Sequence, residues 1–334
     1  MTTSVFISGA TGFIAQHIIT LLVTKGYNVV GSVRSAAKGE HLKELYGSKF
    51  QFEVVPVLEK QGAFDEALKN HPEVTVFLHT ASPVTFSAED NERDILIPAI
   101  NGTKFVLDSI HRTSPQIKRV VYTSSIVAIA SPQQLSDPTY EGGEEFFSPI
   151  TYEEGKSNGF FAYFASKTFA EKAAWEFVES NKPNFALSTI NPVYVVGPQA
   201  KDEEAKGEVN ITAQIITSIY NLKKDDKVPE TAGNFVDVRD VAKAHVLAFE
   251  KEETKGQRLI TLANKFNSQL ILNIIRKNFP ELRETLPVGN PDDIDLSAIP
   301  NLKNEKSRNL LGIEYIDFEK SVTDAIKQVI RANA

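Results

Sequence analysis

Two side chains that could move a proton lie one helical turn apart in this sequence. Tyr163 and Lys167 occupy positions i and i+4 of residues 161–180, whose pattern predicts a helix, so both side chains share one face. A tyrosine phenol has an ordinary pKa of about 10, and a cation fixed beside it is expected to lower that value. The pair could then donate a proton to a carbonyl oxygen near neutral pH. Taken alone the pattern is weak, because a helix face with an amphipathic tyrosine and a solvated lysine has the same spacing.

Hydroxyl side chains close one of the expected strands. The run RVVYTS, residues 119–124, predicts a buried strand, and Thr123, Ser124 and Ser125 lie at its end. Open α/β sheets bind ligands outside the carboxyl ends of their strands. A serine hydroxyl in that place could hydrogen-bond a substrate oxygen as hydride arrives, which is a small contribution of the oxyanion type.

A glycine-containing turn follows the first expected strand, residues 4–8, and opens an expected helix, residues 12–26. In this turn Gly9 permits a tight bend, Gly12 lets a ligand approach the backbone, and Ala15 lets the helix pack on the sheet. The exposed N–H groups and the helix dipole favour a pyrophosphate. Small residues at such turns can be purely structural, but the position at the first strand–helix turn favours a dinucleotide site.

Two cations follow the second expected strand, residues 28–33. Arg34 and Lys38 stand where an NAD-binding chain places an acid on the ribose 2′-hydroxyl, and no acid occurs before Glu40. A guanidinium offers a planar fork to a phosphate, and an ammonium offers a mobile charge. The sequence therefore predicts that the cofactor is NADPH and not NADH. The alternative is that Arg34 and Lys38 are ordinary solvated surface residues with no ligand.

The elements that must position these residues alternate along the chain. Short β-branched or aromatic runs predict further buried strands at 52–57, 75–80, 119–124 and 185–192. Helical patterns lie between them at 64–70, 94–112 and 161–180. Such alternation predicts the α/β class, with a doubly wound parallel sheet, helices on both faces and right-handed crossovers.

Beyond about residue 194 the pattern becomes less regular. It predicts a strand at 257–262 and helices near 238–250, 268–279 and 317–331. We expect a Rossmann-type NADP-binding domain over residues 1–193, which some later segments rejoin. Residues 194–334 are expected to form mainly a smaller, mixed α/β lobe that binds substrate.

Composition excludes several classes of function. The 334-residue chain carries a formal net charge of -7 and no basic stripe, so it is a poor candidate for nucleic acid or anionic membrane. The chain has no cysteine, which excludes disulfides and thiolate metal sites, and its six histidines show no metal spacing. No apolar run approaches the roughly 20 residues of a membrane helix, and the first strand begins at Ser4 or Val5 with no room for a leader. We expect a cytoplasmic monomer or homodimer without a metal.

These motifs together resemble the extended short-chain dehydrogenase/reductases over nearly the whole chain. Within that family the sequence is similar to the fungal NADPH-dependent methylglyoxal and 3-methylbutanal reductases. The resemblance is carried by SGATGFIAQHI (8–18), GSVRS (31–35), LHTASP (78–83), ERDILIPAINGT (92–103), VVYTSS (120–125), YFASK (163–167), FAEKAAWEF (169–177), NPVYVVGPQ (191–199) and DVRDVAKAH (237–245).

The resemblance implies a catalytic set and a reaction. Ser125, Tyr163 and Lys167 would reduce small aldehydes, dicarbonyls and ketones to alcohols, with hydride coming from the nicotinamide. Tyr163 would donate the proton, Lys167 would bind the nicotinamide ribose and tune the phenol, and Ser125 would steady the carbonyl.

The resemblance also implies how the cofactor and the substrate are held. The cofactor contacts would be Gly9, Thr11, Gly12, Phe13 and Ile14 at the pyrophosphate, Arg34 and Lys38 at the 2′-phosphate, Val57 and Leu58 at the adenine, and Pro192, Val195 and Thr212 with Tyr163 and Lys167 along the nicotinamide half. The substrate pocket would include Val84, Ile126 and Tyr194.

The chain departs from the family pattern at two places. Relatives often carry an acid where Val57 stands, so only backbone contacts to the adenine are expected from Val57 and Leu58. Ile126 and Ala130 occupy positions that are often aromatic, which predicts a pocket wall of altered substrate range.

Two other functions are compatible with the same fold. A nucleotide-sugar epimerase or dehydratase usually prefers tightly held NAD, and Arg34 argues against that class. A non-catalytic protein that senses NADPH would tend to lose the tyrosine–lysine pair, which is intact at Tyr163 and Lys167.

Overall fold

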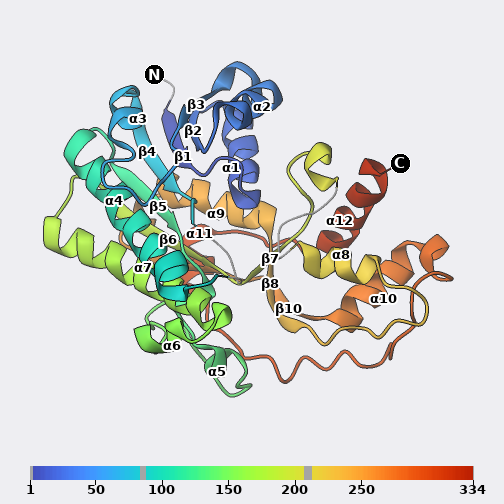
Figure 1. The fold of residues 1–334 in the computed structure, drawn as a ribbon. Coiled ribbons are helices and arrows are strands. Elements are labelled where there is room, and N and C mark those ends of the chain that lie inside the picture. Colours follow the sequence, from blue (N-terminus) through green and yellow to red (C-terminus); the bar gives the residue numbers. More distant parts are fainter. Residues whose placement is uncertain (1–2, 83–87, 207–212, 334) are drawn as a thin grey trace.

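A seven-stranded parallel sheet forms the centre of the molecule. The computed structural model describes residues 3–82, 88–206 and 213–333 (Figure 1). The sheet consists of β1 (Ser4–Ser8), β2 (Asn28–Val33), β3 (Phe50–Val54), β4 (Val74–His79), β5 (Arg119–Thr123), β6 (Ala186–Pro192) and β9 (Arg258–Thr261). Their order across the sheet is β3-β2-β1-β4-β5-β6-β9, and each neighbouring pair is parallel. The order reverses between β1 and β4, which is where such sheets bind ligands.

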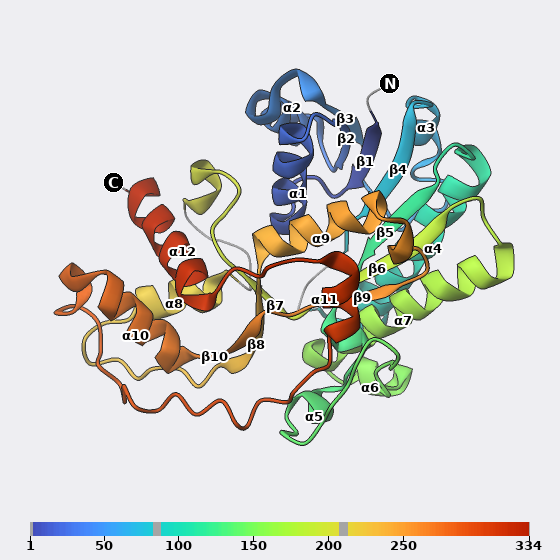
Figure 2. The ribbon, with the colours of Figure 1, turned by 180° about the vertical axis from the view of Figure 1, so that it is seen from behind.

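Helices cover both faces of this sheet and complete what we call the large lobe. Its helices are α1 (Phe13–Thr24), α2 (Ala36–Tyr46), α3 (Asp65–Lys69), α4 (Ile97–Thr113), α5 (Pro132–Leu135), α6 (Tyr152–Lys156), α7 (Gly159–Asn181), α9 (Val238–Glu250) and α11 (Glu305–Leu311). Helices α4 and α7 pack together on one face, and α1 and α9 pack together on the other (Figures 1 and 2). The doubly wound α/β architecture predicted from the sequence is therefore confirmed.

The central strand β1 shows how two apolar layers hold the large lobe together. Its side chains alternate between the faces: Val5 and Ile7 join the core beneath α1 and α9, whereas Phe6 joins the core beneath α4 and α7. Phe6 stacks on Phe77 of β4, with ring centroids 5.1 Å apart. All five residues of β1 are buried because both faces are covered, which is why Val5, Phe6 and Ile7 are apolar in succession with no alternation.

A second, mixed sheet forms the core of what we call the small lobe. Strands β7 (Tyr194–Val196), β8 (Ala232–Asp237) and β10 (Asn264–Asn267) lie in the order β10-β8-β7. Strand β7 is parallel to β8, whereas β10 is antiparallel to it. Helices α8 (Gln214–Tyr220), α10 (Ser268–Asn278) and α12 (Phe318–Ala332) pack around a core that includes Phe235, Phe266 and Phe318. The expected mixed α/β lobe is present, and α9 and β9 return to the large lobe; the domain division at residue 193 stays a prediction.

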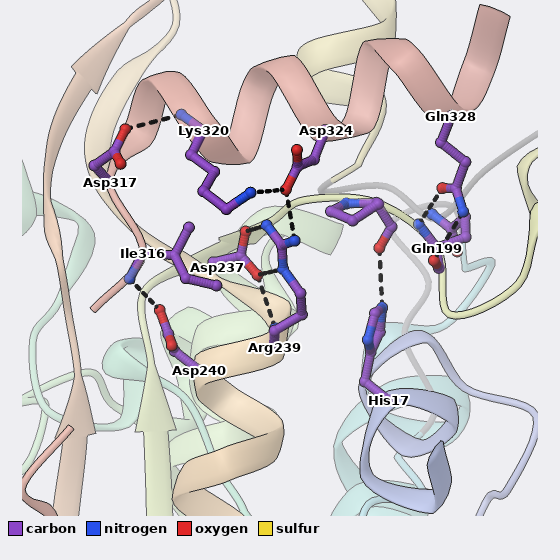
Figure 3. A network of polar contacts seen from close by, with 11 residues as sticks. His17, Gln199, Asp237, Arg239, Asp240, Ile316, Asp317, Lys320, Asp324 and Gln328 are labelled. Atoms are coloured by element: carbon purple, nitrogen blue, oxygen red, sulfur yellow. Dashed lines mark hydrogen bonds and ion pairs between the residues drawn. The ribbon is translucent and has the colours of Figure 1, made fainter. Parts of the chain in front are cut away.

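A polar network joins the small lobe to the large lobe where α9 begins (Figure 3). The Arg239 guanidinium donates to both oxygens of Asp237 at 2.7 and 2.8 Å and to Asp324 of α12 at 2.6 Å. The Asp237 carboxylate also accepts the backbone N–H of Arg239 and so caps the start of α9. On α1, His17 Nε2 contacts the carbonyl of Pro198 at 2.9 Å. These contacts join α9 to α12 and α1 to the segment that follows β7.

The sequence-based assignment is wrong at the third strand and at α2, and it did not include β7, β8, β10, α5, α6, α8 or α11. The third strand spans Phe50–Val54 and not 52–57, because Pro56 has no N–H for the ladder. Helix α2 was not expected, since Gly39 in its interior lowers helix propensity. Gly39 is needed there because a Cβ would lie 2.2 Å from the ring of Phe52, so α2 packs unusually close to β3.

Two histidines are buried in neutral form in the large lobe. His245 of α9 is held by the carbonyl of Val241 at 2.8 Å and the hydroxyl of Thr123 at 2.7 Å. A carbonyl can only accept, so Nδ1 carries the proton and Nε2 accepts from Thr123. Burial lowers the pKa of His245 to about 4 and that of His79, on β4, to about 3.

We expect the free energy of unfolding to fall as the pH falls below the ordinary histidine value of 6.5. The unfolded chain binds protons at His245 and His79 in this range while the folded chain does not, so the unfolded state gains stability. His245→Gln should flatten the slope between pH 6.5 and 4, whatever its effect on stability at neutral pH. Urea unfolding at a series of pH values measures the slope, and an identical slope in both proteins would contradict the assignment.

Candidate active site

The parallel sheet brings the expected site residues to one edge. In the registers, Ile7 lies beside Gly31, Ser8 beside His79, and Thr123 beside Ile190. The segments that follow β2, β1, β4, β5 and β6 are therefore neighbours at the carboxyl edge. This edge is the expected place for an extended dinucleotide.

The glycine turn lies after β1 at the centre of that edge. Gly9 has a φ of 68°, and a Cβ on it would lie 2.9 Å from the Cα of Ala81, so only glycine fits. Its N–H donates to the hydroxyl of Ser32 at 3.1 Å. Gly12 begins α1 without a side-chain cap, which leaves the first N–H groups of the helix available to an anion. Thr11 and Gly12 are exposed, and Phe13 and Ile14 are partly buried.

The two cations expected at the adenosine end flank the adjacent strand. Arg34 directly follows β2, Lys38 lies in the first turn of α2, and both are exposed. Within the described parts of the chain neither forms an ion pair, so both remain available to a ligand phosphate. Past β3, Val57 is 48% exposed, while Leu58 packs into the core against α4. Leu58 is only partly buried, and the expectation that Val57 and Leu58 offer backbone contacts to an adenine stays a prediction.

Helix α7 places the tyrosine and the lysine on the face toward the sheet. Its first turn is capped by Asn158, whose side chain accepts the N–H of Phe161 at 3.0 Å. The Tyr163 phenol is hydrogen-bonded to the hydroxyl of Ser125. Ser125 lies two residues after the end of β5 and begins the short turn that follows. The structure therefore brings Ser125 and Tyr163 together across 38 residues of sequence.

The expectation that Lys167 lowers the pKa of Tyr163 is wrong in this structure. Burial of the phenol is the largest effect and raises its pKa; the Ser125 hydrogen bond opposes that rise, and Tyr194 adds to it. Lys167 is not among the groups that act on Tyr163, because spacing on a helix fixes a shared face but not the degree of solvation. The phenol is thus held in its protonated form, which is the form that can donate.

Lys167 is a buried cation at the same edge. Burial lowers the pKa of its ammonium to about 8, and no ion pair or hydrogen bond is made to it within the described residues. Its charge also helps to lower the pKa of His79. The hydroxyl of Ser8 accepts the N–H groups of Thr80 and Ala81, so its own proton points to Nδ1 of His79 at 2.8 Å. His79 is therefore uncharged, and its Nδ1 is already occupied by the Ser8 hydroxyl.

The remaining expected residues are distributed over β6, β7 and the loop after β5. Tyr194, 43% exposed on β7, lies close enough to influence Tyr163. Ile126 is 7% exposed and packs in the core of the large lobe, so its place in the pocket wall stays a prediction. Pro192 ends β6 and Val195 is buried in β7. Val84 and Thr212 lie outside the described residues.

One buried acid was not identified from the sequence. Glu171 lies four residues after Lys167 on α7, is fully buried, and pairs with Arg258 of β9 at 2.5 Å. The available signal was its helical spacing from Tyr163 and Lys167 among small residues such as Ala170 and Ala174, which indicates a buried face. No set of three or more His, Asp or Glu side chains in the described ranges could hold a metal ion. Over the same ranges, no helix is both long and apolar enough to cross a bilayer.

The strand order, the glycine turn and the tyrosine–lysine pair define an extended short-chain dehydrogenase/reductase. Residues 5–263 match the model of the NAD dependent epimerase/dehydratase family, and the chain belongs to that family. The NADPH-dependent methylglyoxal reductase GRE2 of Saccharomyces cerevisiae is 44% identical over 98% of both chains.

Two solved structures are similar over nearly their whole length. A reductase engineered to attenuate substrate inhibition in asymmetric catalysis is 61% identical, with a TM-score of 0.97 over 99% of this chain and 100% of that chain. Gre2 of Candida albicans, in complex with NADPH, is 42% identical, with a TM-score of 0.97 over the same shares.

Lys167→Met is expected to stabilise the cofactor-free protein at pH 7 by roughly 2–3 kcal/mol, because burying an unpaired ammonium is costly. Between pH 8 and 10.5 the unfolded chain binds more protons at this position than the folded chain, so the wild type recovers stability as the pH rises. The gap between the two proteins should therefore shrink above pH 8. Thermal unfolding across this range measures it, and Lys104→Met, which removes an exposed lysine of α4, is the control. A variant less stable than the wild type at pH 7 would contradict the cost.

Proposed function

We propose that this oxidoreductase reduces small aldehydes, dicarbonyls and ketones to alcohols with NADPH, and that Tyr163 is the proton donor. The observation that carries the proposal is the hydrogen-bonded pair of Ser125 and protonated Tyr163 beside buried Lys167, at the edge that the glycine turn opens. The names of GRE2 and of the engineered enzyme, reductases that align over nearly the whole chain, support this class of reaction.

The residues present fit NADPH. The uncapped start of α1 suits the pyrophosphate, and the exposed, unpaired Arg34 and Lys38 suit the 2′-phosphate. The ammonium of Lys167 is desolvated and offers donors to the nicotinamide ribose. When bound, the nicotinamide supplies the hydride.

The side chains then divide the work on the carbonyl oxygen. Tyr163 holds its proton until the oxygen gains charge, since burial keeps the phenol protonated, and then donates it. Ser125 hydrogen-bonds the same oxygen and orients it relative to the phenol. Tyr194, part-exposed beside Tyr163, is placed to form one wall for the substrate.

Alternative functions are separable by simple observations. A nucleotide-sugar epimerase would be isolated with stoichiometric, non-exchanging NAD, and a sensor would bind NADPH without oxidising it in the presence of carbonyls. The division into residues 1–193 and 194–334, the cytoplasmic location and the monomeric or homodimeric state also remain proposals.

Tyr163→Phe is expected to lower kcat for methylglyoxal by at least about 100-fold, the usual range for loss of a general acid. Removal of one hydroxyl should leave NADPH binding within about twofold, because the ring still fills its place. Loss of absorbance of the reduced nicotinamide gives kcat, and quenching of the fluorescence of Trp175 gives the Kd for NADPH. Retention of most of the activity would remove Tyr163 from the acid role.

Arg34→Ala is expected to raise the KM for NADPH by about tenfold or more, since a charged hydrogen bond to phosphate contributes roughly 1.5–3 kcal/mol. NADH lacks the phosphate and serves as the internal control, so its KM should change by less than about twofold. Steady-state kinetics with both cofactors measures the ratio. Equal changes for the two cofactors would show that Arg34 does not contact the 2′-phosphate.

A further inference from the structure

A fully buried carboxylate on α7 receives hydrogen bonds from four side chains. Glu171 is 0% exposed and lies one turn beyond Lys167. Its donors are Ser124 and Asn191 on Oε2 and Trp175 and Arg258 on Oε1. The proposed reaction assigns this group no task. A buried charge this completely satisfied indicates a fixed position in the fold.

The two oxygens of Glu171 serve different parts of the molecule. On Oε1, the Trp175 indole lies at 3.2 Å and the Arg258 guanidinium at 2.5 Å, so this side faces the body of the lobe. On Oε2, the hydroxyl of Ser124 and the amide of Asn191, at 2.7 Å, face the carboxyl edge. The Glu171 carboxylate therefore connects Trp175 and Arg258, on its Oε1 side, with Ser124 and Asn191 at the carboxyl edge.

The Oε2 side leads directly to Ser125 by two routes. Ser124 is its neighbour in the chain, and the backbone N–H of Ser124 also bonds Ile190 at 2.8 Å. The Asn191 amide that donates to Glu171 also contacts the carbonyl of Ser125 at 3.1 Å. Ser125 is extended, with φ -162° and ψ 160°. Its carbonyl is held by Asn191, and the residue before it is held at its hydroxyl by Glu171 and at its N–H by Ile190.

The Oε1 side anchors the same carboxylate to two loops through Arg258. Its guanidinium donates to the carbonyls of Glu144, at 2.8 Å, and of Phe146 and Ala128. The ring of Phe147 covers it, with the centroid 3.8 Å from the guanidinium carbon. Ala128 closes the turn that begins at Ser125, so Arg258 braces the far end of this turn.

We infer that Glu171 is a positioning residue for Ser125, which sets the catalytic hydroxyl against Tyr163 through Ser124 and Asn191; this inference rests on the proposed function. A carboxylate suits the task because Ser124, Asn191, Trp175 and Arg258 all donate to it. A glutamine would turn an amide N–H toward at least one other donor. The mechanism needs Ser125 in one place relative to the carbonyl oxygen, and a misplacement of about 1 Å can cost on the order of 100-fold in rate.

The test compares two variants that each remove one donor from Glu171. Ser124→Ala removes the hydrogen bond on the site side, and Trp175→Phe removes the one on the framework side and is the matched control. We infer that the position of Ser125 depends on the hydrogen bond between Ser124 and Glu171 and not on the one from Trp175. Ser124→Ala should therefore lower kcat for methylglyoxal by about tenfold, with the KM for NADPH within about twofold. Trp175→Phe should leave both constants within about twofold. Thermal unfolding of both variants shows whether their loss of stability is comparable.

Equal effects of Ser124→Ala and Trp175→Phe on kcat would overturn the inference, since Glu171 would then serve stability alone. A wild type that binds NADPH but reduces no carbonyl would overturn the proposed function and this inference with it. The two failures are thus distinguished by the activity of the wild type.

A double variant separates positioning from stability in a second way. Glu171→Met alone leaves the Arg258 cation buried without its partner, whereas the pair Glu171→Met and Arg258→Met removes both charges and should recover stability. The site side still lacks its acceptor in the double variant. We therefore expect kcat to stay at least about tenfold below the wild type while the Tm recovers. Recovery of kcat together with the Tm would contradict a positioning role.

Discussion

The parallel pairing of the strands is the constraint on which the rest of this structure depends. Because every strand of the large sheet runs the same way, all carboxyl ends meet at one edge. The turn at Gly9, the hydroxyl of Ser125 and the end of β6 at Pro192 become neighbours there, although 183 positions separate the first from the last. Helix α7 lies across the neighbouring face and adds Tyr163 and Lys167 to the same edge.

The buried charged groups near this edge differ in whether they have a partner of opposite charge. Glu171 and Arg258 are buried as a pair with a full set of hydrogen bonds, which fixes the loops on either side. Lys167 is buried with no partner in the described chain, and its lowered pKa records the cost. A cost that the fold leaves uncompensated at a site is typical of a group reserved for a ligand. The apolar layers of the sheet, such as the stack of Phe6 on Phe77, supply the stability that tolerates it.

Much of the architecture could be predicted from local pattern. The apolar runs at residues 4–8 and 119–124 fix buried strands, and the turn at Gly9 fixes the start of α1, because these signals lie within a few residues. Helix α2 was missed because its Gly39 is explained only by the ring of Phe52, a contact with the next strand. The bounds of β3 were misjudged for a similar reason, since pairing with β2, and not composition, decides where the strand begins.

For the site, the sequence by itself determined which chemical groups are available and which share a helix face. It identified Tyr163, Lys167, Ser125 and Arg34 by type and spacing. Only the tertiary structure decided how these groups are solvated: the phenol of Tyr163 has a raised pKa and not a lowered one, and Lys167 has lost its water. It also decided that Glu171 faces Ser124 and Asn191. The physical reason is that spacing along one helix sets direction, whereas burial and hydrogen bonding depend on segments that are distant in sequence and meet only when the sheet forms.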